Sequence, residues 1–154
     1  MQRRSFLRGI GIAAAVSAVV TPTMVMAAAP KGPNNLGFDA AVNAITGGKK
    51  VTVSSKVHMR APEIAENGAV VPITVTVDSP MTDSDYIRAI HILASKNGNV
   101  RCVDVMLTPA NGIAMFAARI KLGTSQDVVA IVETSKGEFL RASQNVKVTI
   151  GGCG

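Results

Sequence analysis

The 154-residue sequence predicts an all-β sandwich, with one short helix before it and a flexible Gly-Gly-Cys-Gly arm after it. About seven short segments rich in valine and isoleucine follow one another between residues 51 and 150. Dipeptides typical of turns separate them, at Asn67-Gly68, Ser79-Pro80, Asn97-Gly98, Asn111-Gly112 and Lys136-Gly137. Strands of this number and spacing favour an immunoglobulin-like sandwich, and a small barrel is the alternative.

The first 27 residues have the composition of a secretory signal peptide. Arg3, Arg4 and Arg8 form a basic region, and a short apolar run with small residues follows them. The stretch "RRSFLRG" also carries the twin-arginine export pattern, in which Arg3 and Arg4 are the signal residues. A cut after Ala27 fits the small residues before it. We therefore expect a periplasmic protein.

Residues 28–37 read as a flexible lead, and a short helix is expected directly after them. Phe38, Val42 and Ile45 recur at helical spacing, and Gly47-Gly48 end the pattern. We expect this helix to pack against the edge of the sandwich. The sandwich domain itself is expected to span residues 38–150.

The β segments are expected at residues 51–59, 70–78, 86–94, 100–108, 113–122, 127–134 and 138–150. Most of them alternate, as Val71, Ile73, Val75 and Val77 do in the second segment. The segment 86–94, "YIRAIHILA", is apolar on both faces. Its second face is either an interface with a partner or a surface covered within the domain.

Several classes of function have no support in the sequence. Without the three signal arginines the chain has 13 basic and 10 acidic residues, and neither a basic cluster nor an aromatic platform for nucleic acid is present. No second apolar run is long enough to span a membrane. His58 and His91 are isolated, so the sequence predicts no metal site, and it shows no catalytic triad or phosphate loop. We expect neither catalysis nor a cofactor.

Cys102 lies inside a predicted strand, where simple alternation places it on the face of Asp104, away from Val103 and Val105. It is then an outward or interface residue, and the alternative is a buried, inert thiol. A disulfide between Cys102 and Cys153 is the ordinary expectation for two cysteines in an exported chain.

Cys153 stands near the end of the chain, and residues 151–154 form the predicted arm. Gly151, Gly152 and Gly154 leave this arm slim and free to bend. Four extended residues reach about 14 Å from the domain, which is enough to enter a buried active site. Nothing in the arm activates the thiol, and the carboxylate of Gly154 disfavours the thiolate. The arm is therefore typical of a substrate carrier whose chemistry is performed by other proteins.

These features together resemble the SoxY family, the sulfur-carrier subunits of bacterial thiosulfate oxidation. The resemblance rests on the twin-arginine signal and on "FDAAVNAITGG", "APEIAENGAVVPITV", "FAARIKL" and "VKVTIGGCG". The family motif usually ends with one more glycine than this chain has. Cys102 is not part of the family pattern.

The resemblance implies that Cys153 holds sulfur intermediates covalently and that the chain pairs with a SoxZ-like β-sandwich subunit. It also implies three client enzymes. A haem enzyme couples thiosulfate to the cysteine, a hydrolase releases sulfate, and a molybdenum-containing sulfur dehydrogenase oxidises the remaining sulfur. The carrier itself is then no enzyme and has no cofactor besides the bound sulfur. The rival interpretation is a disulfide-stapled periplasmic binding or adhesion module.

Overall fold

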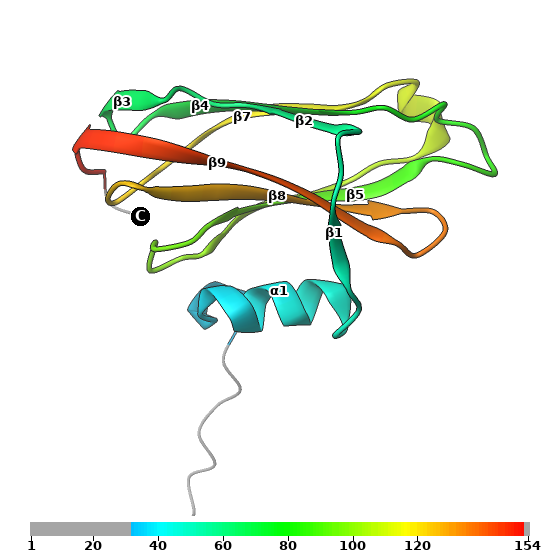
Figure 1. Ribbon diagram of the computed structural model, residues 1–154, viewed down its shortest axis with the longest axis horizontal. Helices are drawn as coiled ribbons and strands as arrows, with labels where there is room; N and C mark the ends of the chain where they lie inside the picture. Colours follow the sequence, from blue (N-terminus) through cyan, green and yellow to red (C-terminus); the bar gives the residue numbers. More distant parts are fainter. Residues whose placement is uncertain (1–31, 153–154) are drawn as a thin grey trace, which may run out of the picture.

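The computed structural model describes residues 32–152, and Figure 1 shows their arrangement. The predicted signal peptide 1–27, residues 28–31 of the lead, and Cys153 and Gly154 lie outside the described residues. A short 3-10 helix, η1 (Pro33–Asn35), precedes the α-helix α1 (Phe38–Thr46). The strands are β1 (Val51–Val53), β2 (Val57–Arg60), β3 (Ile64–Asn67), β4 (Val71–Val77), β5 (Ile87–Ala94), β6 (Arg101–Met106), β7 (Ala114–Ile120), β8 (Gln126–Thr134) and β9 (Phe139–Ile150), with a second 3-10 helix, η2 (Pro109–Asn111), before β7.

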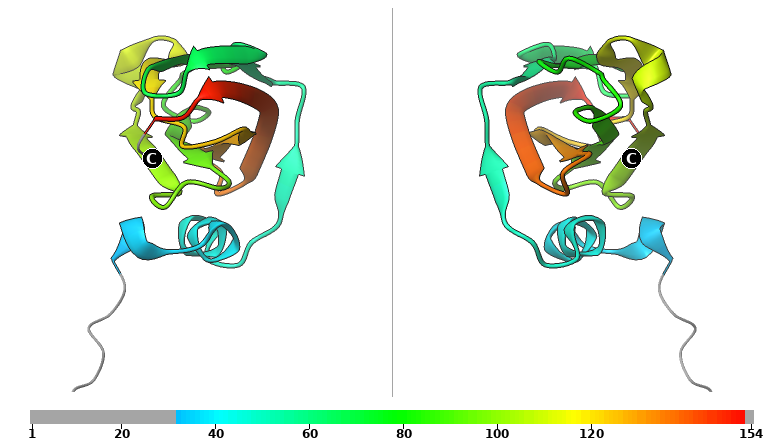
Figure 2. Two further views of the ribbon diagram at one scale, coloured as in Figure 1. Left: turned by 90° about the vertical axis from the view of Figure 1, so that its left-hand side faces the viewer. Right: turned by 90° about the vertical axis from the view of Figure 1, so that its right-hand side faces the viewer.

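The strands form two sheets that face each other, as the sequence predicts. The larger sheet has the order β1-β9-β8-β5-β6, and β3 pairs with β9 beside this path. The smaller sheet has the order β2-β4-β7. Two edge strands, β6 and β7, each pair on one side only, and Figure 2 shows the layers end-on with the helix beneath them. The all-β sandwich is therefore confirmed.

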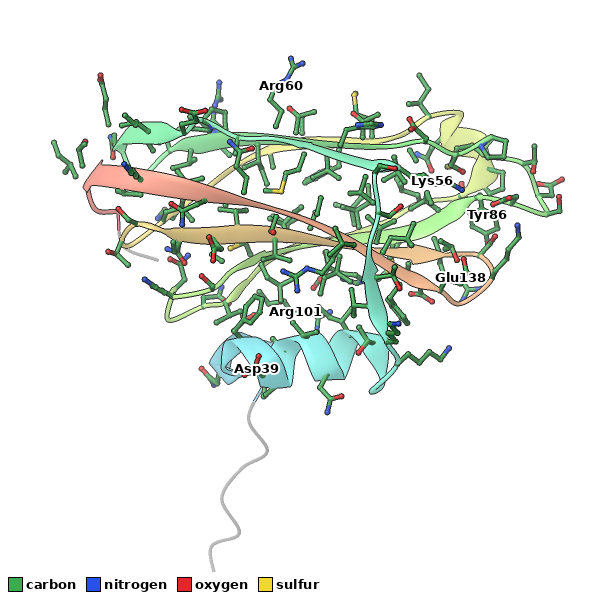
Figure 3. All side chains as sticks on the ribbon, viewed as in Figure 1. Asp39, Lys56, Arg60, Tyr86, Arg101 and Glu138 are labelled. Atoms are coloured by element: carbon green, nitrogen blue, oxygen red, sulfur yellow. The ribbon has the colours of Figure 1, made fainter. Side chains whose placement is uncertain are left out.

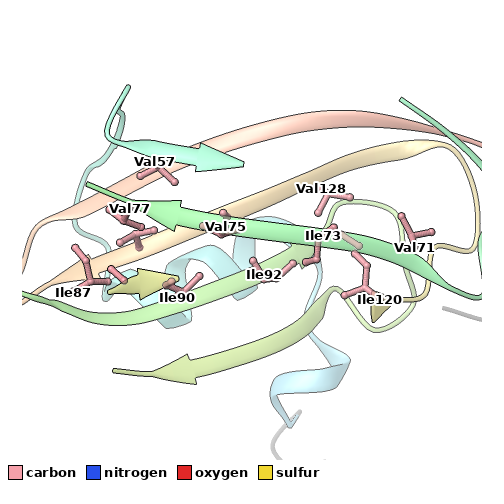
Figure 4. Packing of buried hydrophobic residues seen from close by; sticks show 14 of the residues in the cluster. Val57, Val71, Ile73, Val75, Val77, Ile87, Ile90, Ile92, Ile120 and Val128 are labelled. Atoms are coloured by element: carbon pink, nitrogen blue, oxygen red, sulfur yellow. The ribbon is translucent and has the colours of Figure 1, made fainter. Parts of the chain in front are cut away.

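The main core lies between the two sheets. Its buried side chains come mostly from β4, β5, β7 and β8, and Figure 4 shows their packing; Ile73, Val75, Ile90, Ile92, Val128 and Val132 are almost fully buried. Along each strand these residues are an even number of positions apart, because side chains alternate between the two faces of a sheet. This gives the alternation seen in the sequence. Figure 3 shows side chains filling both this space and the space between the larger sheet and α1.

The second apolar face of β5 is covered by α1 and is not available to a partner. Ala41 of the helix is fully buried there, against Leu93, Val129 and Ile131 of the larger sheet. Phe38 and the other apolar helix residues pack around this contact. The expectation that the helix packs at the edge is wrong, because the two-faced strands β5 and β8 need cover on both faces.

Two differences concern the strands before residue 70. The expected strand 51–59 is two strands, because the chain turns at Ser55 and Lys56 and crosses from the larger sheet to the smaller one. Strand β3, at residues 64–67, was not expected, and it forms by parallel pairing with the end of β9. The residues described thus contain nine strands instead of about seven.

Candidate carrier site

The last described residues of the chain are fixed to the domain by backbone hydrogen bonds. Gly68 N–H donates to Ile150 O at 2.7 Å, and Leu122 N–H donates to Gly68 O, also at 2.7 Å. Gly152 N–H then donates to Leu122 O at 3.0 Å. We call these contacts of Gly68, Leu122, Ile150, Gly151 and Gly152 the arm base. The arm base joins three segments that are far apart in the sequence.

Glycine is needed at the arm base because the backbones approach closely. A Cβ at Gly152 would lie 2.5 Å from Ala69 N, and a Cβ at Gly151 would collide with Gly123 O. A Cβ at Gly68 would collide with Leu122 O and come within 2.8 Å of Gly152 N. These distances are below those that real Cβ atoms show, so any other residue would displace the backbone.

Two buried side-chain amides, of Asn97 and Gln126, hold the backbone next to the arm base. Gln126 Nε2 donates to Asn97 Oδ1 at 2.7 Å, and both side chains are almost completely buried. Asn97 Nδ2 donates to Lys121 O at 2.7 Å, and Gly123 N–H donates to Asn97 Oδ1 at 3.0 Å. Since buried amides are satisfied only in the correct geometry, these bonds fix the backbone on either side of Leu122.

The sequence singled out Gly151 and Gly152 for flexibility of the arm, and this role stays a prediction. The structure gives them the additional role of close backbone approach. Sequence reasoning missed Asn97, Leu122 and Gln126. Gly68 was present only within the turn signal and the motif "AENGAVVP", where nothing indicated that it meets the end of the chain.

Cys102 lies on the inner face of the larger sheet, where it packs against the main core beside Val103. The β5–β6 register shifts between Ile92, which pairs with Val103, and Leu93, which pairs with Arg101. Cys102 is therefore the extra residue of a β-bulge, and the bulge reverses the alternation on which its outward placement depended. That placement is wrong.

The Cys102 thiol is free, and its Sγ lies 3.7 Å from Val100 O. Burial raises the pKa of Cys102 to about 11, although hydrogen bonds from the Ala94 backbone and the Asn97 side chain offset part of this effect. A thiol that stays protonated at neutral pH is a poor nucleophile, which favours the inert alternative.

Both histidines have carboxylate partners that the sequence spacing did not reveal. His58 Nε2 lies 2.9 Å from Asp78 Oδ2 at the surface. His91 is buried, and its Nδ1 lies 2.6 Å from Asp104 Oδ1 on the neighbouring strand. Within residues 32–152, no three His, Cys, Asp or Glu side chains come close enough together to hold a metal ion.

Asp104 also accepts from Arg101 Nε, which lies 2.9 Å from its Oδ2. Burial alone would raise the pKa of Asp104, but the hydrogen bonds from His91 and Arg101 outweigh it and lower the pKa below its ordinary value. The three residues form a hydrogen-bonded cluster on the helix-facing side of β5 and β6.

A surface cavity of about 240 Å³ opens between the edge strands β6 and β7. Asn97, Asn99, Cys102, Arg119 and Lys121 contribute to its lining. It adjoins the arm base, because Asn97 and Lys121 belong to the loops that hold Leu122.

Among the helices of the described residues, none has the length and apolar character needed to cross a membrane.

Residues 42–153 match the family model described as "Sulfur oxidation protein SoxY". Among solved structures, the chain is similar to the sulfur carrier protein SoxY from Chlorobium limicola f thiosulfatophilum. The identity is 30% and the TM-score 0.62, over 73% of this chain and 96% of that one. The comparison with curated protein sequences gave no match.

The fold is also similar to that of a superoxide reductase (neelaredoxin) from Ignicoccus hospitalis. The identity is 21% and the TM-score 0.55, over 60% of this chain and 80% of that one. The superoxide reductase from Nanoarchaeum equitans has 10% identity and a TM-score of 0.52, over 62% of this chain and 99% of that one. At these identities the likeness concerns the fold alone.

Proposed function

The chain belongs to the SoxY family of sulfur oxidation proteins, and we propose that it is a periplasmic carrier that holds thiosulfate-derived intermediates covalently on Cys153. The family and the likeness to a SoxY sulfur carrier make it a sulfur-oxidation carrier. The residue that carries the sulfur and the compartment are the parts that we propose.

The observation that carries the proposal is the extent of the family match, which runs from residue 42 to residue 153 and so includes the terminal cysteine. Strand β9 leads directly to this cysteine, and the arm base fixes the chain through Gly152. The proposed carrier thiol belongs to the residue directly after this fixed point. This suits a group that client enzymes load and unload.

The chemistry proposed for Cys153 begins with oxidative coupling. The thiol and thiosulfate form an S–S bond, and a haem client takes up the two electrons while one proton is released. A hydrolase then cleaves off sulfate with water, and a sulfur dehydrogenase oxidises the sulfur that remains. In this scheme the chain performs no catalysis and needs no cofactor.

Membership of the family implies a SoxZ-like partner subunit. The second face of β5 cannot be its contact surface, because α1 covers that face. We therefore place the partner elsewhere on the domain. The three client enzymes are part of the proposal.

The first prediction concerns Cys153 itself. Cys153→Ser will abolish loading by thiosulfate and the client enzymes and will leave the thermal midpoint unchanged, because serine is close in size to cysteine and the thiol is proposed to act only as the attachment point. Intact-mass spectrometry measures the loading. Cys102→Ser is the matched control; it will load normally but unfold at a slightly lower temperature, because the more polar serine packs less favourably against the main core that Cys102 contacts.

The same measurement tests the rival interpretation. A disulfide-stapled binding or adhesion module would show a mass lower by two hydrogens, and both serine variants would lose stability together. A large loss of stability in Cys153→Ser would therefore overturn the carrier proposal.

A further inference from the structure

Strand β7 forms a free edge of the smaller sheet, and its residues 114–118 carry no charge. It pairs with β4 on one side only, in a continuous register from Ala114 to Ile120. In an antiparallel pair, every second residue directs its backbone N–H and C=O away from the partner strand. Along its open side, β7 therefore presents a row of backbone donors and acceptors with which a further strand can pair.

The other free edges among the described residues have features that hinder strand pairing. β1 has three residues, and β2 and β3 have four each. β2 carries His58 and Arg60, and β3 carries Glu66. β6 carries Arg101 and Asp104 and contains a bulge. Short length, charges and bulges commonly protect edge strands, whereas β7 has seven residues and neither a charge nor a bulge over 114–118.

Large apolar side chains are exposed beside this edge. Ile113 is 66% exposed and Met115 is 53% exposed, and Met106, at the end of the edge strand β6, is 67% exposed. The connection 107–113 joins the two edge strands at the end of the sandwich away from the arm base, on the right in Figure 1. Methionine is enriched in protein interfaces because its flexible side chain adapts to a partner. The three residues therefore indicate a surface that binds another protein.

The main core is also incompletely covered between the two edge strands. Phe116 and Ala118 of β7 and Val103 and Val105 of β6 pack against this core but stay partly exposed. The inner faces of a sandwich normally shield each other's side chains. A strand added to β7 covers more of Phe116 and Ala118, and this burial stabilises the complex through the hydrophobic effect.

The unpaired charges around the open edge are positive. Arg119 at the end of β7 and Lys121 just after it form no ion pair within residues 32–152, and neither does Arg60 on the outer face of the smaller sheet. Asp78, directly after β4, and Asp104 of β6 have histidine partners. A partner strand with carboxylates matches this charge, whereas a strand with lysines is repelled by it.

We propose that β7 pairs with an edge strand of the SoxZ-like partner subunit, so that the smaller sheet continues into the partner. The existence of this partner rests on the proposed function, and β7 supplies its contact surface. The partner strand is apolar opposite residues 114–118 and carries a carboxylate opposite Arg119. In this mode of binding the main-chain hydrogen bonds provide affinity, and the side chains on either face provide specificity.

Hydrogen exchange of the mature chain, alone and in complex with the purified SoxZ-like subunit, locates the contact without any substitution. We expect the amides of residues 114–119 to exchange about tenfold or more slowly in the complex, because their backbone groups gain partners. The amides of β1, β2 and β3 should keep their rates. Protection that appears on another edge, and not on β7, would overturn the inference.

Met115→Lys/Ala117→Lys gives β7 the charges that the protected edges have. This double variant should bind the partner about tenfold or more weakly in isothermal titration calorimetry. Val53→Lys/Ile64→Lys is the matched control, because it adds the same two charges at exposed apolar residues of β1 and β3. The control should bind as the unmodified chain does, and equal affinities of the two double variants would overturn the inference.

Arg119→Glu tests the charge of the partner strand. It should weaken binding about three- to tenfold at low salt and reduce the dependence of affinity on salt, because it replaces an attraction by a repulsion. Lys50→Glu makes the same reversal at an exposed residue between α1 and β1, and it should change neither quantity. An unchanged affinity in Arg119→Glu would overturn the assignment of an acidic partner strand.

A second copy of this chain is the competing occupant of the edge. Sedimentation velocity of the chain without the partner detects it. A homodimer that dissociates in Met115→Lys/Ala117→Lys, together with partner binding that this variant retains, would overturn the proposal. None of these results decides the carrier proposal, which fails instead if the client enzymes do not load Cys153.

Discussion

At the scale of single residues, the arm base depends on glycines, because it has no space for a Cβ atom at their positions. Gly68 lies where the turn after β3, the segment after β7 and the end of β9 meet, and its carbonyl and N–H bond to Leu122 and Ile150. A methyl group at this position has no free space. The motif "AENGAVVP" therefore has a physical reason for its glycine.

Gly68→Ala is predicted to lower the free energy of unfolding by about 1–3 kcal/mol, because the added Cβ must displace the Leu122 backbone. Chemical denaturation measures the loss. Gly32→Ala is the control, since a Cβ there meets nothing within 4 Å and its φ of −65° suits any residue. Equal stability of the two variants would show that the contacts at Gly68 are not made in solution.

Asp104→Asn is predicted to destabilise the domain by about 1 kcal/mol at neutral pH, a value discounted for partial exposure of the carboxylate. The pKa of Asp104 is lowered in the fold, so its contribution is present above the unfolded pKa and is lost as the pH falls through the lower, folded one. The two proteins should therefore converge below about pH 4. Urea titrations at several pH values test this, and a gap that widens in acid would contradict it.

At the scale of elements, α1 turns an exposed sheet face into a second small core. Ala41 has no accessible surface, whereas its neighbour Ala40 is exposed. The closeness of the helix to Leu93 and Val129 therefore depends on a small side chain at position 41.

Ala41→Leu is predicted to cost about 1–3 kcal/mol through overpacking, whereas Ala40→Leu will be nearly neutral. Thermal unfolding of both variants compares the same chemical change on two sides of one helix. If the two midpoints fall equally, helix propensity or solubility, and not packing on the sheet, controls the effect.

Strands that bury one or both faces were predictable, because their apolar residues alternate or form a continuous run between turn residues. The segment 51–59 kept its alternation across a change of sheet, so a local pattern could not show that it divides. Strand β3 has one buried residue, Ala65, and depends on a partner more than 80 positions away. The bulge at Cys102 is likewise a property of pairing, and the same holds for the arm base, whose members meet only in the folded chain.

At the scale of the whole molecule, the proposed export signal and the proposed partner belong together. Twin-arginine export moves folded proteins, and a chain without a cofactor needs another reason for folding first. A partner that binds in the cytoplasm and lacks its own signal is such a reason. The second face of β5, which the sequence offered as a possible interface with a partner, is covered by α1. The hypothesis of joint export therefore depends on the signal alone.

Arg3→Lys/Arg4→Lys is predicted to keep both this chain and its SoxZ-like partner in the cytoplasm. Fractionation and immunoblotting of the two proteins measure the outcome, with Lys31→Arg as a control outside the signal. A partner that still reaches the periplasm would rule out joint export. A chain that still reaches it would rule out the twin-arginine route.

The pairing of strand β9 also determines how the domain responds to a mechanical force applied along this strand. Its first part pairs with β8 and its last part with β3, and the chain turns after Ile150 to reach the arm base. A pull directed along β9 acts across the direction of its ladder hydrogen bonds. Those bonds then share the force in shear and must yield together, whereas a sideways pull would unzip them one at a time. A force along this strand therefore meets the resistance of its whole ladder, which protects the domain from unravelling one hydrogen bond at a time.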